Sequence, residues 1–566
     1  MRLFNNVASV LSTVLFYLVI AVCIVPNAVL CVTEQMPPLY AAVNILLPAG
    51  VYWTFMSLSS HVGRSVLWMF IIMFLSAFEI VLLDLYGNSV IGVDMWLNVV
   101  TTNSNEIGEL LGNLLPVIVL VCLLYLPPLS VGIVALVRKW RLTGRFMRVN
   151  RAAGAATALC GALLMVVGIV SGGYMSPVRY IFPVNAVDNA LIASERYRLT
   201  SRYHDTSLGF SYGARSEHPD SLREVYVLVV GETSRAANWE MLGYGRATNP
   251  ELKGQGGTVA FGKVLSESNT THKSVPLLLS SLTADSFGDS IYSVKGIVTA
   301  FKEAGFHTVF LSNQERNGSF IDFFGEEADE SLFVKEQAGD RYLRDECLLE
   351  YLDSALSRHG EGRIMVVLHT YGSHFNYRER YSGQFSHFRP DDASEARREN
   401  REMLLNAYDN SIRYTSHLLS RIVSRLADEG SVAAMLYTSD HGEDIYDDDR
   451  GLFLHASPRP SAYQLHVPYL VWTSDAYNSA YPRTLENAVR NSGKNVSSSR
   501  SFFHTALDLA GIGCGAFDPA ASVVNDLYAE PERRYLTDHN EAVPLGSSGL
   551  ADPDFRYFSD HGIASE

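Results

Sequence analysis

The chain has 566 residues, 48% of them hydrophobic and 19% charged, and a formal net charge of −15 at neutral pH. Residues 1–175 carry 8 Lys or Arg against 6 Asp or Glu, whereas the other 391 residues carry 37 against 54. This division argues against a wholly water-soluble protein and indicates an apolar first third joined to an acidic, globular remainder. Only Cys347 and Cys514 lie beyond the apolar third, so at most one disulfide can form there and a disulfide framework is excluded.

The first third contains five apolar segments, each close to or above the roughly 20 residues that a helix needs to cross the hydrocarbon core of a membrane. They are 8–32, 40–58, 65–86, 114–137 and 152–175. The first segment lacks the strongly basic start of a cleavable signal peptide and is too long for its apolar region. We therefore predict an N-terminal transmembrane domain of five helices in residues 1–175.

Basic residues predict the orientation of these spans. Six of them cluster between the fourth and fifth segments: Arg138, Lys139, Arg141, Arg145, Arg148 and Arg151. An excess of Lys and Arg marks a loop as cytoplasmic. With five spans, Arg2 and the short loop containing His61 and Arg64 also lie inside. Everything after residue 175 is then expected outside the cytoplasm.

A polar stretch separates the third and fourth segments. Asn98, Thr102 and Glu106 recur every four residues in it, which places them on one face of a helix near 94–111. Such a face is either an ordinary solvated surface or, at the membrane surface on the outer side, a place to hold a lipid headgroup.

The rest of the chain divides into a connector and a second domain. Residues 176–224 mix aromatic with polar and basic residues, which favours a segment lying against the membrane. In 225–566, short apolar runs alternate with helix-length amphipathic segments, as in an α/β domain with a mostly parallel sheet. The expected strands are 225–230, 308–311, 364–368, 432–437 and 468–472. The expected helices are 293–304, 341–358, 394–428 with breaks, and 499–510.

Polar side chains follow four of these strands. Glu232 comes after the first, Gln314 closes a polar run after the second, His374 lies just beyond the third, and Asp440 and His441 follow the fourth. Parallel strands present ligand-binding residues at their carboxyl ends. Carboxylates and imidazoles gathered at one rim predict a site for a divalent metal such as zinc. The acidic run 447–449 is expected to be a solvated loop.

The segment 267–276 supplies candidate nucleophiles, because it reads as a loop that enters a helix. Backbone N–H groups at a helix start favour negative charge. A threonine hydroxyl held there and bound to a metal could attack phosphorus. Spacing alone does not choose between Thr270, Thr271 and Thr233, and a plain N-cap is the alternative for the first two.

Four motifs in this order carry a family resemblance. The segments GETSRAANWEMLGYGRATNPEL, TTHKSVP, HTYGSHFNYRERY and SDHGE, the last followed by LH-x-x-P, resemble the membrane-bound phosphoethanolamine transferases of Gram-negative bacteria. These enzymes belong to the alkaline phosphatase and sulfatase superfamily. The resemblance covers nearly the whole chain and implies an α/β/α sulfatase-like domain at 225–566, behind the five-helix membrane domain.

The resemblance also implies roles for individual residues. Thr271 corresponds to the nucleophile. The zinc ligands correspond to Glu232, Thr271, Asp440 and His441. His374 and His455 match histidines near the phosphate and a possible second metal, where one could act as general acid, and Glu443 matches a residue beside the same pocket. The positions attributed to lipid substrate binding correspond to Asn98, Thr102 and Glu106.

The sequence departs from the family pattern in two places. Well-known members carry several disulfides in the soluble domain and a cysteine shortly before the nucleophile, whereas this chain has Ser268 and Asn269 there. A family lysine that contacts phosphate is replaced near 316–318. These differences leave the chemistry intact but weaken any transfer of acceptor specificity.

The implied activity is transfer of phosphoethanolamine from phosphatidylethanolamine, through a covalent intermediate on Thr271, to lipid A, the lipopolysaccharide core or another envelope glycan. One zinc ion is expected, with room for a second. The protein is expected to act as a monomer in the inner membrane, with its catalytic domain in the periplasm and no nucleic-acid partner. The alternatives are a phosphoglycerol transferase of the same superfamily and a membrane-anchored non-catalytic receptor.

Overall fold

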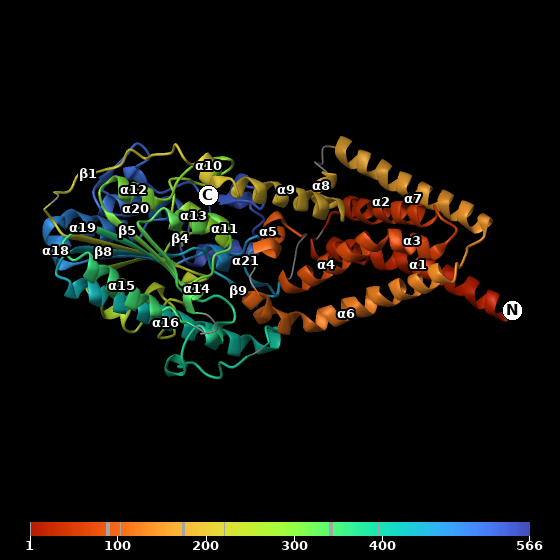
Figure 1. Ribbon diagram of the computed structural model, residues 1–566, viewed down its shortest axis with the longest axis horizontal. Helices are drawn as coiled ribbons and strands as arrows, with labels where there is room; N and C mark the ends of the chain where they lie inside the picture. The colour runs from red at the N-terminus through yellow and green to blue at the C-terminus, as the bar shows by residue number, and fades with distance from the viewer. Residues whose placement is uncertain are drawn as a thin grey trace. The chain divides into compact units, whose positions relative to one another are not determined.

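The computed structural model describes residues 2–34, 36–86, 91–101, 104–171, 176–219, 221–338, 343–393 and 395–565. The chain divides into two compact units (Figure 1). The first unit comprises Met1–Trp96 and Leu110–Ser194, and the second comprises Leu97–Glu109 and Glu195–Glu566.

Long apolar helices make up the first unit. Four are long and apolar enough to cross a membrane: α1 (Arg2–Thr33), α2 (Pro38–Met56), α6 (Ser104–Val137) and α7 (Gly144–Val170). A fifth span forms if α3 (Val62–Trp68) and α4 (Phe70–Tyr86), which meet at a 52° bend, are taken together. Each of the five predicted apolar segments therefore coincides with a helix or with this bent pair.

Two boundaries differ from the sequence expectation. The third segment is broken at Met69 and is not one straight helix. The last long helix starts earlier than 152, because the hydroxyl of Thr143 accepts a hydrogen bond of 3.2 Å from the N–H of Phe146 and caps it. Arg145, Arg148 and Arg151, expected in a loop, therefore lie in the first turns of α7.

Helices α2 and α7 approach each other closely through glycines. A Cβ added to Gly50 would lie 2.1 Å from the backbone nitrogen of Ala158, and one added to Gly161 would lie 2.6 Å from that of Leu47. Gly154 meets Thr54 in the same way, at 2.7 Å. Small residues let helix backbones pack at short distance in a membrane, where no hydrophobic driving force draws the helices together.

The polar stretch near 94–111 forms parts of two helices. Its first part is α5 (Val93–Thr101), and its second part is the beginning of α6, which continues into the fourth apolar segment. The described residues of the predicted helix near 94–111 are therefore helical. Residues 102 and 103, between the two helices, lie outside the described ranges.

A seven-stranded sheet forms the centre of the second unit. Its strands lie in the order β3 (Thr258–Phe261), β11 (Tyr469–Thr473), β8 (Val432–Ser439), β2 (Glu224–Gly231), β7 (Ile364–His369), β5 (His307–Ser312) and β6 (Glu330–Phe333). Strands β8, β2, β7, β5 and β6 are parallel, and β11 runs antiparallel to both of its neighbours. The five predicted strands are all present, and β3 and β6 are additional.

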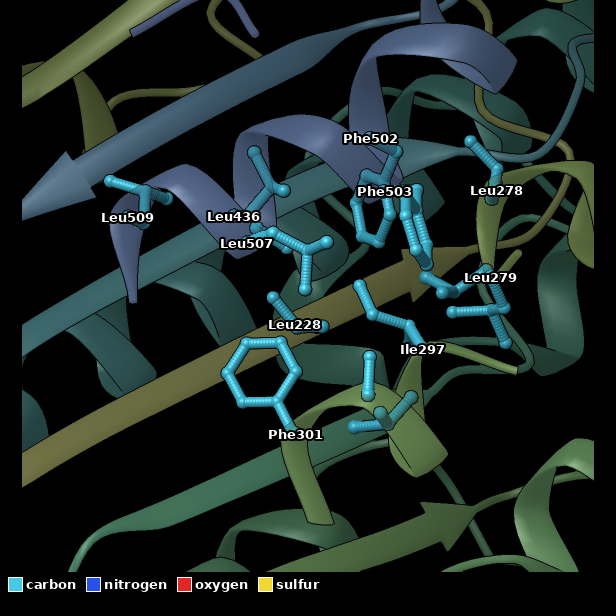
Figure 2. Close-up of a cluster of buried hydrophobic side chains, with 14 of the residues drawn as sticks. Leu228, Leu278, Leu279, Ile297, Phe301, Leu436, Phe502, Phe503, Leu507 and Leu509 are labelled. Atoms are coloured by element: carbon cyan, nitrogen blue, oxygen red, sulfur yellow. The ribbon is translucent and has the colours of Figure 1, made fainter. Parts of the chain in front are cut away.

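Helices cover both faces of this sheet (Figure 1). On one face lie α11 (Thr271–Leu278), α12 (Ile297–Glu303), α13 (Phe320–Glu326) and α20 (Ser498–Leu509), and on the other lie α15 (Cys347–Arg358) and α16 (Arg401–Asp428). Figure 2 shows the core under α20, where Phe502, Phe503 and Leu507 pack towards Leu228 and Leu436 of the sheet. Buried apolar surface on both faces explains why β2 and β8 read as unbroken apolar runs.

The expected helices at 293–304, 341–358, 394–428 and 499–510 correspond to α12, α15, α16 and α20. The predicted connector 176–224 is partly helical, with α9 (Val184–Thr200) as its main element. Cys347 and Cys514 are both free, so the one disulfide that the sequence allows is absent.

We predict that Gly161→Leu destabilises the membrane unit, because its side chain would meet the backbone of α2. Overpacking costs typically about 1–3 kcal/mol, and the melting temperature of the detergent-solubilised protein should fall. Ala155→Leu is the matched control, since Ala155 is an exposed residue on α7. Equal melting temperatures for the two variants would contradict close packing of α2 on α7.

Candidate active site

The carboxyl ends of three neighbouring strands bring the predicted residues together. Strand β2 lies between β7 and β8 and is parallel to both, so the three strands end at one edge of the sheet. Glu232 follows β2 directly, and Asp440 and His441 follow β8. All three side chains are buried. Positions far apart in sequence are therefore adjacent, as expected for a site at the carboxyl ends of parallel strands.

Four side chains converge on a single point at this edge. The hydroxyl Oγ1 of Thr271 lies 3.0 Å from Nε2 of His441 and 3.3 Å from Oε1 of Glu232. The same Nε2 lies 3.5 Å from Oε1 of Glu232 and 3.2 Å from Oδ2 of Asp440. The four residues implied as zinc ligands thus face one another.

The tautomer of His441 makes this point suitable for a cation. Its Nδ1 lies 2.9 Å from the carbonyl oxygen of Gly442, which can only accept, so Nδ1 carries the proton. Its Nε2 then faces the carboxylates of Glu232 and Asp440. Although burial opposes it, these two charges raise the pKa of His441, so the space between the three groups favours positive charge, either a proton or a metal ion. Imidazole nitrogen and carboxylate oxygen are common zinc ligands, and a hydrogen bond to the other ring nitrogen orients such ligands. The donor set therefore fits zinc.

Thr271 is distinguished from the other two candidate hydroxyls by its position. It is the first residue of α11, where the unpaired N–H groups of a helix start favour negative charge. Its side chain is partly exposed. Thr270 contacts Ser268 instead, at 3.4 Å between hydroxyl oxygens. Thr233 is fully buried and gives its hydroxyl proton to Oε1 of Glu232 at 2.8 Å.

Thr233 forms hydrogen bonds to the carboxylates of both Glu232 and Asp440. Its backbone has φ +60°, which is rare for a β-branched residue and costs on the order of 1–3 kcal/mol. This conformation directs its N–H to Oδ1 of Asp440 at 3.2 Å while its hydroxyl contacts Glu232. Tyr408 holds the turn by donating its hydroxyl to the carbonyl oxygen of Thr233 at 2.6 Å.

Two further histidines border the convergence point. His455 follows the short strand β10 (Phe453–Leu454), and its ring centre lies 4.1 Å from that of His441. Ligand atoms of Glu232, His441 and His455 all lie within 4.8 Å of one another. His374 is farther away, with its ring centre 6.1 Å from that of His455.

Glu443 orients His455, one of these two histidines. Its Oε2 lies 2.9 Å from Nδ1 of His455, and its Oε1 accepts a hydrogen bond from the hydroxyl of Tyr377. Burial raises the pKa of Glu443 to about 8 and lowers the pKa values of His374 and His455 to about 3. Both imidazoles are therefore neutral, with Nδ1 of His374 held by the carbonyl oxygen of Phe375 at 2.7 Å.

Two supporting residues contact the carboxylates: Gln314, noted from the sequence only as the end of a polar run, and Ser274, which was missed. The Oγ of Ser274 lies 3.2 Å from Oδ2 of Asp440, and Nε2 of Gln314 donates to Oε2 of Glu232 at 3.3 Å. Ser274 stands three residues after Thr271 in α11, so helical spacing places it on the same side as the nucleophile candidate. Gln314 belongs to the polar run after the second predicted strand.

The acidic run 447–449 is not simply a solvated loop. The side chain of Asp447 is 4% exposed, and it pairs with the buried Arg235 at 2.6 Å and with Arg401 at 3.1 Å. Asp448 pairs with Arg450 at 2.6 Å, and only Asp449 is fully exposed. The expectation fails for Asp447 because the loop folds back on a guanidinium that also donates to the carbonyl oxygen of Glu443.

The predicted lipid-binding positions are only partly visible. Asn98 lies in α5 and Glu106 in α6, but their side chains are outside the described part of the structure. Thr102 lies outside the described residues altogether. Arg316, in the stretch where a family lysine is replaced, is paired loosely with Glu326 and Glu336 at 3.7 Å.

Comparison with known proteins places this site in a family. The sulfatase family model matches residues 224–512. The Kdo(2)-lipid A phosphoethanolamine 7''-transferase of Escherichia coli K12 is 27% identical over 277 residues, which are 47% of each chain. The chain spans about half the length of the curated relatives it matches.

Two solved structures share the fold. The lipooligosaccharide phosphoethanolamine transferase A (EptA) of Neisseria meningitidis, an integral membrane protein, matches with a TM-score of 0.73 at 21% identity, over 90% of this chain and 98% of that one. The zinc complex of the periplasmic domain of EptC from Escherichia coli matches with a TM-score of 0.52 at 23% identity, over 59% of this chain and 97% of that one. Since the family model covers just over half of the 566 residues, the chain belongs to the sulfatase family, in the alkaline phosphatase and sulfatase superfamily.

Proposed function

We propose that this protein transfers phosphoethanolamine from phosphatidylethanolamine to a lipopolysaccharide acceptor, in lipid A or the core, or to another envelope glycan. The observation that carries the proposal is the hydroxyl of Thr271, held at a helix start within 3.0 Å of His441 and 3.3 Å of Glu232. The similarity to a Kdo(2)-lipid A phosphoethanolamine transferase supports the choice of transferred group and acceptor class.

The first half-reaction places phosphoethanolamine on Thr271. Its Oγ1 attacks the phosphorus of the donor, the bond between phosphorus and the diacylglycerol oxygen breaks, and the leaving oxygen takes up a proton. Zinc held by Glu232, Asp440 and His441 would supply the positive charge that favours the ionised hydroxyl and stabilises the phosphoryl oxygens. Ser274 and Thr233 keep Asp440 oriented during this step.

The second half-reaction returns the threonine to its free form. A hydroxyl or phosphate oxygen of the acceptor attacks the same phosphorus, and Oγ1 of Thr271 leaves. His374 and His455 border the convergence point, and a neutral imidazole there can accept the proton of the attacking hydroxyl and pass it to the leaving oxygen. Glu443 fixes the ring of His455 through its Nδ1.

The apolar helices suit a reaction between two embedded lipids. We infer that they span the inner membrane with the basic residues at 138–151 on the cytoplasmic side, which places the catalytic unit in the periplasm. We assign lipid-donor binding to Asn98, Thr102 and Glu106. Tethering the site at the membrane raises the local concentration of donor and acceptor.

Thr271→Val should abolish the covalent phosphoethanolamine adduct and lower transfer by about 10³-fold or more, because it removes the attacking oxygen with little change in shape. Thr270→Val, which deletes the neighbouring hydroxyl in the same way, should keep the adduct. Intact-protein mass spectrometry after incubation with donor lipid measures both. An adduct that survives in Thr271→Val would exclude Thr271 as the nucleophile.

Phosphatidylethanolamine, and not phosphatidylglycerol, should label the wild-type protein when each lipid carries a labelled headgroup. Lipopolysaccharide from cells that express the protein should then gain the mass of phosphoethanolamine relative to cells that lack it. Labelling by phosphatidylglycerol alone would favour the phosphoglycerol transferase and refute the proposed donor.

Ser274→Ala should weaken zinc binding or transfer by about 10–100-fold, since groups that orient metal ligands have effects of this size. Ser280→Ala is the matched control, because Ser280 also bonds the carbonyl oxygen four residues earlier but lies away from Asp440. Zinc affinity is measured by competition with a chromophoric chelator. Equal affinities in the two variants would show that Ser274 does not act on the metal site.

A further inference from the structure

A second group of metal-ligating side chains lies at the opposite edge of the sheet. His307 is the first residue of β5, Glu330 is the first residue of β6, and His359 follows the last residue of α15. Strands β5 and β6 are parallel, so both residues stand where their strands begin. The catalytic residues follow the ends of parallel strands in the same sheet, and the two groups are therefore separate.

Both imidazoles of this group point to the same carboxylate oxygen. Oε1 of Glu330 lies 3.0 Å from Nε2 of His307 and 2.8 Å from Nε2 of His359. The two rings are nearly parallel, with centres 3.7 Å apart and an angle of 23° between their planes. Ligand atoms of the three residues lie within 4.8 Å of one another.

The backbone holds the three residues in place. The N–H of His307 donates to the carbonyl oxygen of Arg363 at 2.9 Å, which secures the start of β5 beside β7. The guanidinium of Arg223 donates to the carbonyl oxygen of His359 at 2.6 Å. Three different elements thus present their ligands from fixed positions, which lowers the entropy lost when an ion binds.

Glu330 keeps one carboxylate oxygen for the two imidazoles. Its Oε2 pairs with Arg358 at 2.5 Å, and its Oε1 is the oxygen that both rings contact. A second carboxylate, Asp329, lies near the other ring nitrogen of His307. It pairs with Lys302 at 2.7 Å, and its Oδ2 is 3.9 Å from Nδ1 of His307, which is beyond hydrogen-bond distance.

The geometry points to a second metal site, in which His307, His359 and Glu330 bind a divalent cation of the zinc type at the edge of the sheet. A tetrahedral ion with bonds of about 2.1 Å holds its ligands about 3.4 Å apart, so a small opening of the present contacts admits it. The side chains of His307 and His359 are 30% and 27% exposed, which leaves the fourth position to water. Two imidazoles and one carboxylate favour zinc over magnesium or calcium.

Such an ion would join the edge strand β6 to β5 and to the end of α15. Strand β6 is the last strand of the sheet and has four residues. The ion would thus crosslink three elements through their side chains. This site is independent of the proposed transfer reaction.

The test uses the full-length protein in detergent, stripped of metal and dialysed against zinc chloride. His359→Ala should bind one zinc ion per chain fewer than its parent, both in the wild type and in the Asp440→Asn background, where the catalytic site is weakened. Zinc should also raise the melting temperature of Asp440→Asn, and this rise should disappear when His359→Ala is added. Plasma mass spectrometry and differential scanning fluorimetry give the two readings.

Two further variants keep the test decisive. Glu330→Gln preserves the shape of the side chain and should also lose one zinc ion, which covers the case in which His359→Ala folds poorly. His417→Ala removes a histidine that pairs with Glu251 at 2.7 Å and with Glu346 at 3.7 Å but belongs to neither group of clustered metal-ligating side chains in the described residues, and it should lose none. Unchanged zinc content in both His359→Ala and Glu330→Gln would overturn the assignment.

Discussion

Buried negative charge at the ends of β2 and β8 is the constraint on which the catalytic unit depends. Glu232 and Asp440 have almost no exposed surface, and Nε2 of His441 faces both. Carboxylates are costly to bury unless a cation or several hydrogen bonds compensate for the lost water. The backbone turn at Thr233, the hydroxyl of Ser274 and the start of α11 surround this charge, so the parts that stabilise it also present Thr271 to a substrate.

The buried guanidinium of Arg235 supplies positive charge next to the segment that carries Glu443. It pairs with Asp447 at 2.6 Å and donates to Asn238 and to the carbonyl oxygen of Glu443. A charge pair inside a protein gives its greatest benefit when the remaining donors are also satisfied, as they are here. The segment that carries Glu443 is thereby fixed on one side by Arg235 and on the other by Tyr377. A substitution of Arg235 or Tyr377 is therefore expected to change both the activity of the protein and the stability of its fold.

Much of this arrangement could be predicted from sequence, for a physical reason. Strands buried on both faces leave continuous apolar runs, and polar residues at their ends mark the functional edge. The four-residue strands β3 and β6 lie at the margins of the sheet and have partly exposed side chains, so their runs are too weak to recognise. Pairing of Asp447 with Arg235 joins residues 212 positions apart and leaves no local signal. Thr270 and Thr271 are neighbours at a helix start, and only side-chain direction separates them.

Cys347 and Cys514 are both free thiols, so no disulfide between them stabilises the fold. Loop-closing crosslinks stabilise a fold chiefly by restricting the unfolded chain, typically by about 2–4 kcal/mol each. The described part of the catalytic unit has none, and its stability rests on a large two-sided core and on buried polar networks. Thiol reductants therefore have no crosslink to break in this part of the chain, and its unfolding free energy should be the same with and without them.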